Sequence, residues 1–379
     1  MIRIDSNLRK SIDINDDFKE NNVIINEGDS FRIIPKKLDL KKLYIELTTK
    51  CNFDCITCIR NSWSDSIDIM SSDTIDKIFE QIVELPELET IHFGGFGEPL
   101  THPEFLELAK KVKAKGYRGE VITNGQLLDQ KTAKKLIDID FDKIIFSIDA
   151  PKKETLESIR KNADIDMILN NIKNLSDLRT SKSNLDIWLE FVAMKSNIDQ
   201  LDDLLKMANK LNLDGVLITN LIPYTEDMVG EELYDTDEEE IKSRIGGYVS
   251  LHTSYPEMKL RTDRKCNFIE NRSASINWKG EVVPCYPLLH NYQVYIYGRC
   301  RDNKSYNYGN VNHKHLKDIW QQEDYIRFRS RVKQGDFPSC TDCKYVDGCS
   351  MVEDNSLDCW GNQPTCADCL WYRQLIVCP

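Results

Sequence analysis

Short apolar runs alternate with longer amphipathic segments between residues 42 and 219. Runs rich in β-branched residues predict six strands, at Leu43 to Leu47, Thr90 to Phe93, Glu120 to Thr123, Lys143 to Ile148, Asp186 to Ala193 and Gly215 to Thr219. Strands that alternate with helices through short connections imply right-handed parallel crossovers, and hence a barrel, a partial barrel or a doubly wound sheet. In these folds the chemistry lies at the carboxyl ends of the strands.

Helical spacing of apolar residues marks two of the segments between the strands. One stripe consists of Ile75, Ile78, Phe79, Ile82 and Val83, and the other of Phe105, Leu106, Leu108, Ala109 and Val112. Gly116 stands where a C-terminal cap of the second helix belongs. The sequence therefore predicts an α/β unit over residues 41–225.

The chain changes character on both sides of this unit. Two short apolar segments around a turn-like Asn26 to Asp29 stretch predict a hairpin within an N-terminal extension of residues 1–40. An acidic helical stretch from Glu231 to Arg244 predicts a bridge over residues 226–262. Residues 263–379 hold ten of the thirteen cysteines and few periodic apolar residues, so we expect no long helix there and a core organised by metal.

Composition narrows the classes of function. The 379 residues include 50 Lys and Arg against 62 Asp and Glu, and a formal net charge of -12 argues against a sequence-independent grip on nucleic acid or anionic lipid. No apolar stretch reaches the roughly 20 residues that a membrane span needs, and the first residues lack the apolar core of a secretory signal. We therefore expect a cytoplasmic protein with no membrane or nucleic-acid partner, whose reduced cysteines favour metal binding.

Three cysteines follow the first predicted strand within eight residues, in the spacing Cys51-x3-Cys55-x2-Cys58. Structural zinc usually takes four protein ligands, whereas three cysteines on a 4Fe-4S cluster leave one iron open to another ligand. A zinc site that borrows its fourth ligand from elsewhere is the alternative.

Small and polar residues stand at the ends of the next strands. Glycines at a strand end let a ligand approach the backbone, although such a segment is often only a turn. The segments hold Gly94, Gly95, Gly97 and Glu98 after the second strand, Asn124 after the third, and Ser147 and Asp149 after the fourth. Arg160 follows on the next helix, where a solvated arginine is the alternative, and Asp149 has an alternative role as a helix N-cap.

The cysteine run, with its preceding Thr and following Asn-Phe, resembles the signature of the radical SAM superfamily, and the strand-end segments match that family in order. The resemblance implies a partial (β/α)6 TIM-like barrel and a 4Fe-4S cluster whose open iron chelates S-adenosylmethionine (SAM). Reduction then gives methionine and a 5'-deoxyadenosyl radical. It also implies that Gly94, Gly95, Gly97 and Glu98 hold the SAM amino group, that Ser147 and Asp149 contact its ribose or methionine part, and that Arg160 pairs with its carboxylate. Ala150 stands where the family has glycine.

The later cysteines resemble the SPASM extension of radical SAM enzymes, which holds one or two auxiliary iron-sulfur clusters. By this resemblance one cluster takes Cys266, Cys285 and Cys359, and the other takes Cys340, Cys343, Cys349 and Cys378. Nine residues separate Cys349 from Cys359 where the family usually has three, and the added Cys366 and Cys369 can supply remaining ligands or replace one of these. Cys300 is expected to be a free thiol. Zinc ribbons are the rival interpretation.

The reaction that the resemblance implies also needs a base near the substrate, for which Tyr286 and Glu190 are candidates. Tyr286 stands where sulfatase maturases carry an aspartate, which argues against that activity. The segment from Asp358 to Trp371 resembles SPASM proteins regarded as maturases of tungsten-dependent aldehyde oxidoreductases. We expect a maturase that acts on a peptide or protein, with ferredoxin or flavodoxin as electron donor. Alternatives are a dehydrogenase of a small molecule and a non-catalytic zinc-binding scaffold. His252, His290, His313 and His315 are expected at the surface, without a role.

Overall fold

The computed structural model describes residues 2–5, 16–26, 30–180, 183–235, 238–245 and 251–378. A nine-stranded sheet forms its centre, with the strand order β12-β11-β10-β8-β7-β6-β4-β13-β14. Six parallel strands at its middle follow one another in chain order: β4 (Lys42–Ile45), β6 (Thr90–Phe93), β7 (Arg118–Thr123), β8 (Lys143–Ser147), β10 (Asp186–Ala193) and β11 (Gly215–Asn220). The predicted α/β class and partial barrel are confirmed.

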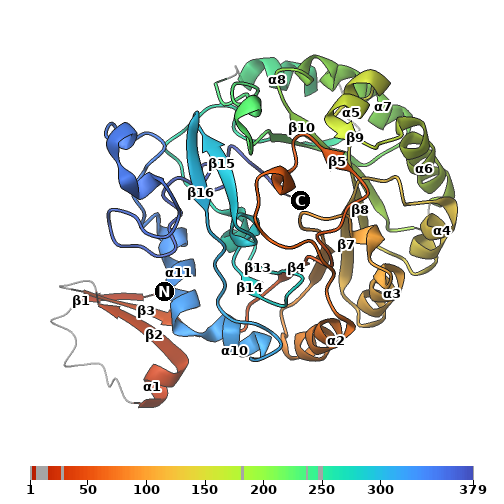
Figure 1. Ribbon diagram of the computed structural model, residues 1–379. Helices are drawn as coiled ribbons and strands as arrows, with labels where there is room; N and C mark the ends of the chain where they lie inside the picture. Colours follow the sequence, from red (N-terminus) through yellow and green to blue (C-terminus); the bar gives the residue numbers. More distant parts are fainter. Residues whose placement is uncertain are drawn as a thin grey trace.

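Helices lie on the outside of this curved sheet (Figure 1). They are α2 (Ser72–Gln81), α3 (Phe105–Ala114), α4 (Gln130–Asp138), α5 (Lys153–Ile159), α6 (Ile165–Leu178) and α7 (Leu201–Lys210). The side chains of Ser71, Asp129 and Asp164 cap α2, α4 and α6 by accepting a backbone N–H two or three residues into the helix. The apolar stripes of these helices pack against the sheet in one continuous core.

Val83 departs from the prediction. It is 58% exposed, because the chain tightens after α2 into the 3-10 turn η3 (Ile82–Glu84) and turns this side chain away from the sheet. Gly116 follows the C-terminal end of α3 with φ of 84°, in the left-handed conformation that a helix-terminating glycine adopts.

The cysteine-rich segment extends the sheet of the barrel. Strand β13 (Ser273–Ile276) pairs in parallel with β4, and β14 (Val282–Val283) pairs antiparallel with β13. On the other edge, β12 (His252–Ser254) runs parallel to β11. Figure 1 shows β15 (Tyr292–Ile296) and β16 (Arg299–Asn303) on the side of the ring that the barrel helices leave open.

Two predictions about helices are wrong in detail. The acidic helix α8 (Glu238–Ile245) starts seven residues later than predicted, and Glu231 to Leu233 are irregular. A long helix is present after Cys266: α11 (Glu323–Gln334) follows α9 (Asn267–Glu270) and α10 (Leu316–Gln321). Tyr325 and Phe328 of α11 are buried in the same core as the barrel helices, so this segment has an apolar core in addition to its cysteines.

The predicted N-terminal hairpin is present. Strands β2 (Asn22–Asn26) and β3 (Ser30–Pro35) pair antiparallel, β1 (Ile2–Asp5) pairs with β3, and α1 (Asp16–Asn21) precedes the hairpin. Three of the predicted turn residues, 27–29, lie outside the described residues. Arg327 of α11 donates to the backbone carbonyl of Ile24, which attaches the hairpin to the cysteine-rich segment. Within the described residues, no helix combines the length and apolarity needed to cross a bilayer.

Candidate active site

The carboxyl ends of the barrel strands surround a cavity of about 270 Å³, which we call the central cavity. The end of the chain lies over the middle of the ring (Figure 1), and Trp371 and Ile376 to Cys378 form part of the wall. The wall also contains most of the residues expected at the site: Cys51, Cys55, Cys58, Gly95, Gly97, Glu98, Asn124, Ser147, Arg160, Glu190 and Tyr286. Gly94 and Asp149 do not line it: Gly94 precedes Gly95, and Asp149 accepts from Arg160.

The loop with the first three cysteines is held against the barrel by backbone pairing. Its short strand β5 (Asp54–Cys55) pairs antiparallel with β9 (Arg160–Lys161), so that Cys55 lies opposite Arg160. N–H groups point at two of the sulfurs. The Phe53 N–H lies 3.4 Å from Cys51 Sγ, and Nε of Arg60 lies 3.3 Å from Cys58 Sγ.

The chemistry of these three thiols fits an iron-sulfur cluster. Burial raises the pKa of Cys51, and it raises that of Cys55 to about 12, so the thiols alone are poorly disposed to ionise together. A bound cluster supplies the positive charge that makes thiolates stable there, and N–H groups aimed at the sulfurs are typical around clusters. Among the described residues, no three His, Cys, Asp or Glu side chains converge on a single-ion site. In a cluster each cysteine binds a different iron.

The glycines after the second barrel strand allow close packing against other parts of the protein, where a Cβ atom would not fit. A Cβ on Gly97 would lie 2.1 Å from the Thr48 carbonyl oxygen and 2.8 Å from that of Lys50, and the Glu98 N–H donates to this Lys50 oxygen at 2.8 Å. Gly95 has φ of 106°, and a Cβ there would meet the side chain of Glu46. The glycines therefore let the Gly94 to Gly97 segment lie directly on the cysteine loop.

Glu98 ties two strand ends together. One carboxylate oxygen accepts from the Thr123 hydroxyl at 2.8 Å and from the Leu100 N–H at 3.0 Å, and the other accepts from the Asn124 N–H at 2.7 Å. Burial raises the pKa of Glu98 to about 6 in spite of these donors. Asn124 continues the chain of contacts, because its side-chain N–H donates to Asn52 at 2.8 Å, next to Cys51.

Ser147, Asp149, Arg160 and Glu190 form one buried network. Nε of Arg160 donates to Asp149 at 2.7 Å, its Nη2 donates to the Ser147 hydroxyl at 2.7 Å, and this hydroxyl donates to Glu190 at 3.0 Å. Burial alone would lower the pKa of Arg160, but the charge of Asp149 raises it. Arg160 is therefore a buried, paired cation at the cavity wall, not a solvated helix residue. The N-cap position of helix α5 is Lys152, so Asp149 is not the N-cap residue of this helix.

Both candidate bases reach the central cavity. Burial raises the pKa of Glu190 to about 7, so the carboxylate changes its charge near neutral pH. Burial raises the pKa of Tyr286 well above its ordinary value, which keeps the hydroxyl protonated. Among the described residues this hydroxyl has no hydrogen-bond partner, and it lies 2.6 Å from the point that a Cβ on Gly94 would occupy.

The later cysteines gather in two groups. Four surround one small apolar cavity of about 20 Å³, and we call Cys266, Cys285, Cys366 and Cys369 the inner group. Burial raises the pKa of each of these thiols, and that of Cys266 reaches about 12. Cys366 and Cys369 thus stand where the resemblance had put Cys359.

The other group lies in the loops after α11. The charges of Cys359 and Cys349 act on Cys340, whose pKa burial raises to about 12, and the Cys343 N–H donates to the Cys340 carbonyl oxygen at 3.2 Å. We call Cys340, Cys343, Cys349 and Cys359 the outer group. Cys378 lines the central cavity and does not line the small cavity of the inner group, although Cys266 of that group acts on its pKa. Cys300 is exposed on β16, as expected for a free thiol.

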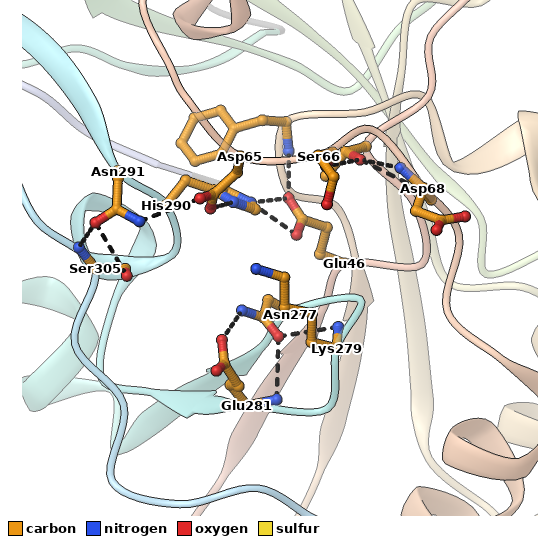
Figure 2. Close-up of polar contacts among 12 residues, drawn as sticks. Glu46, Asp65, Ser66, Asp68, Asn277, Lys279, Glu281, His290, Asn291 and Ser305 are labelled. Atoms are coloured by element: carbon orange, nitrogen blue, oxygen red, sulfur yellow. Dashed lines mark hydrogen bonds and ion pairs between the residues drawn. The ribbon is translucent and has the colours of Figure 1, made fainter.

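One buried network of hydrogen-bonded charged side chains was not predicted from the sequence (Figure 2). His290, expected at the surface, is fully buried between two carboxylates: its Nε2 lies 2.9 Å from Glu46 Oε2, and its Nδ1 lies 2.8 Å from Asp65 Oδ2. Glu46 also accepts the Phe96 N–H at 3.1 Å. The network connects the cysteine-rich segment to the Gly94 to Gly97 segment. Its partners lie far apart along the chain, so no local pattern could have indicated it.

Comparisons with known proteins agree with this arrangement. The model of the radical SAM superfamily matches residues 45–208, and that of SPASM, an iron-sulfur cluster-binding domain, matches residues 266–344. The chain is 38% identical over 348 residues to the tungsten-containing aldehyde ferredoxin oxidoreductase cofactor-modifying protein of Pyrococcus furiosus, and the alignment covers 90% of this chain and 97% of that protein.

Solved structures share the fold. SuiB of Streptococcus suis, bound to its precursor peptide SuiA, superposes with a TM-score of 0.60 at 14% identity, over 83% of this chain and 72% of that one. The structure of anSMEcpe with bound AdoMet and the Cp18Cys peptide superposes with a TM-score of 0.56 at 16% identity, over 89% of this chain and 95% of that one. At such identities the likeness concerns the fold alone.

Proposed function

The chain belongs to the radical SAM superfamily and carries a SPASM domain, and on this premise we propose that it cleaves SAM reductively and modifies a peptide or protein. Its family is one of maturases whose cofactors are SAM and 4Fe-4S clusters. We assign the barrel to residues 41–225 and the SPASM domain to residues 263–379, joined by 226–262 and preceded by the extension 1–40.

The observation that carries the proposal is the convergence of the three cysteines and the ends of β6, β7, β8, β10 and β11 on one cavity. Cys51, Cys55 and Cys58 would hold the cluster, which supplies the electron that cleaves SAM when both are bound. The residues around it would then hold SAM. The Gly94 to Gly97 segment and Glu98 support the site of the amino group, and Ser147 and Asn124 form the rim. Arg160, fixed by Asp149, would face the carboxylate.

Of the two candidate bases, Glu190 is better suited to accept a proton than Tyr286. It lines the same cavity, and with a pKa of about 7 it is available as a carboxylate at and above neutral pH. Tyr286 keeps its proton and would donate a hydrogen bond to the substrate, since its buried hydroxyl has no partner among the described residues. A base beside the reacting carbon would be needed if the modification removed a proton, as in an oxidative reaction.

We propose that the inner and outer cysteine groups each hold one auxiliary 4Fe-4S cluster. Each group offers four thiols, which is the full ligand count of such a cluster. The inner group lies beside the central cavity, with Trp371 in the wall of both cavities. An auxiliary cluster at this place would exchange electrons with the substrate side.

The similarity to the Pyrococcus protein, which covers nearly its whole length, favours a role in maturing a tungsten-dependent aldehyde oxidoreductase. The test is an anaerobic incubation of the reconstituted protein with SAM, reduced ferredoxin or flavodoxin, and such an oxidoreductase polypeptide. Formation of 5'-deoxyadenosine together with a mass change in the polypeptide would support the proposal. Formation of 5'-deoxyadenosine without a mass change in the polypeptide would exclude this polypeptide as the substrate. A protein that holds zinc and no iron would contradict the proposal that the chain is a radical SAM enzyme.

A further inference from the structure

Cys378 is the cysteine that remains when the cluster-forming groups are set apart, and it lies at the central cavity. The inner group already has four thiols around one small cavity. Trp371 lies between the two cavities, and its indole N–H points at Cys378 Sγ at 2.9 Å. Cys378 therefore accepts from an indole donor and lines the central cavity.

The same wall carries a second feature that indicates a ligand. The hydroxyl of Tyr286 is more than nine-tenths buried, has no hydrogen-bond partner among the described residues, and lines the central cavity with Cys378. A buried hydroxyl without a partner is costly unless a bound molecule completes it. Glu190 lies on this cavity too, and its charge acts on Cys378. The thiol of Cys378, the hydroxyl of Tyr286 and the carboxylate of Glu190 thus line one cavity. The residues proposed to hold SAM line the same cavity at the other strand ends.

We propose that Cys378 is a substrate-facing thiol that donates a hydrogen atom to the substrate radical, and that it is not a cluster ligand. This inference rests on the proposed function, because the SAM-derived radical must first take a hydrogen atom from a substrate carbon. The S–H bond of Cys378 then breaks homolytically, a C–H bond forms on the substrate, and a thiyl radical stays on Sγ. One electron from a donor of the ferredoxin class and one proton from water restore the thiol.

The environment keeps this thiol in the form that can donate. Burial raises the pKa of Cys378 to about 12, although the Trp371 donor opposes that shift. Cys378 is therefore an S–H group at neutral pH when it binds no metal. Cys300, which is exposed and lies outside this cavity, offers the matched control.

The first test measures iron in anaerobically reconstituted protein, with Cys378→Ala, Cys369→Ala and Cys300→Ala compared with the wild type. We expect Cys378→Ala and Cys300→Ala to keep the wild-type iron content, while Cys369→Ala loses about four irons. A loss of about four irons from Cys378→Ala, with an unchanged melting temperature, would make Cys378 a ligand and overturn the inference.

The second test needs no substrate and starts with the wild type. In D2O the thiol becomes S–D, and without substrate the 5'-deoxyadenosyl radical would itself take this deuterium, because Cys378 lines the same cavity as the SAM-side residues. Uncoupled cleavage of SAM under dithionite should therefore give 5'-deoxyadenosine that carries one deuterium. Cys378→Ala should reduce the deuterated fraction to background, and Cys300→Ala should leave it in place. Unlabelled 5'-deoxyadenosine from the wild type, or an unchanged label in Cys378→Ala, would overturn the inference. A wild type that makes no 5'-deoxyadenosine defeats the proposed function instead, and the iron contents then decide the status of Cys378.

Discussion

Nε2 of His290 lies 2.9 Å from Oε2 of Glu46, and both side chains are buried where the SPASM domain meets the barrel (Figure 2). Asp65 accepts from the other ring nitrogen, so the imidazole donates from both nitrogens and carries a positive charge. Glu46 in turn accepts the Phe96 N–H, and Gly95 closes over its side chain. The SPASM domain therefore fixes the Gly94 to Gly97 segment through one buried cation.

Replacement of His290 should destabilise the protein in a pH-dependent way. Burial alone would lower the pKa of His290, but Glu46 and Asp65 raise it above its ordinary value. A raised folded-state pKa means that the stabilisation is complete below the unfolded-state pKa of about 6.5 and is lost as the pH rises through the folded-state value. His290→Gln should therefore lower the free energy of unfolding at pH 6 by about 3 kcal/mol, and by less at pH 9. Denaturant titrations at the two pH values measure this difference.

His313→Gln is the control for that experiment, because His313 is exposed on a loop of the same domain. It should unfold like the wild type at both pH values. An equal loss of stability at pH 6 and pH 9 in His290→Gln would mean that packing, and not charge, is what His290 contributes.

Gly97→Ala should displace the cysteine loop. The new methyl group would lie 2.1 Å from the Thr48 carbonyl oxygen, and a backbone atom cannot move away without moving the loop. We expect the variant to lose the iron of the first cluster, about four atoms, while the auxiliary iron stays. Gly348→Ala is the matched control, since nothing lies within 4 Å of the added Cβ. Iron analysis decides, and a full iron content in Gly97→Ala would show that the loop does not need this close approach.

Arg160→Lys should weaken SAM binding about tenfold, because an ammonium group cannot keep the contacts to Asp149 and Ser147 while it faces a carboxylate. The iron content should not change. Equilibrium binding of SAM to the reconstituted protein measures the effect, with Arg118→Lys, on the exposed start of β7, as control. Unaltered affinity in Arg160→Lys would assign this arginine to the fold only.

Double substitutions should distinguish the two auxiliary groups. Cys366→Ala and Cys369→Ala belong to one group, so together they should remove no more iron than either alone, about four atoms. Cys369→Ala combined with Cys359→Ala should remove about twice as much. If Cys359→Ala and Cys369→Ala prove redundant with each other, the grouping by cavities is wrong.

The barrel could be predicted from the sequence because the patterns that mark its strands and helices lie in residues close together along the chain. The six strand runs are dense in β-branched residues, and the site residues stand directly after them, so their meeting point follows from parallel strands alone. The pairing of β13 with β4 and the contact of His290 with Glu46 join residues far apart in the chain, and neither leaves a periodic pattern. The grouping of Cys366 and Cys369 with Cys266 could not be predicted for the same reason. The spacing of cysteines gives the number of ligands but does not show which thiols lie close together in the fold.

The most direct test of the central claim compares the wild type with the variant in which Cys51, Cys55 and Cys58 are all alanine. Both proteins are reconstituted anaerobically, analysed for iron, and incubated with SAM and dithionite. We predict that the variant holds about four fewer irons, keeps its auxiliary clusters and makes no 5'-deoxyadenosine. Cleavage of SAM by the variant at the wild-type rate would contradict it.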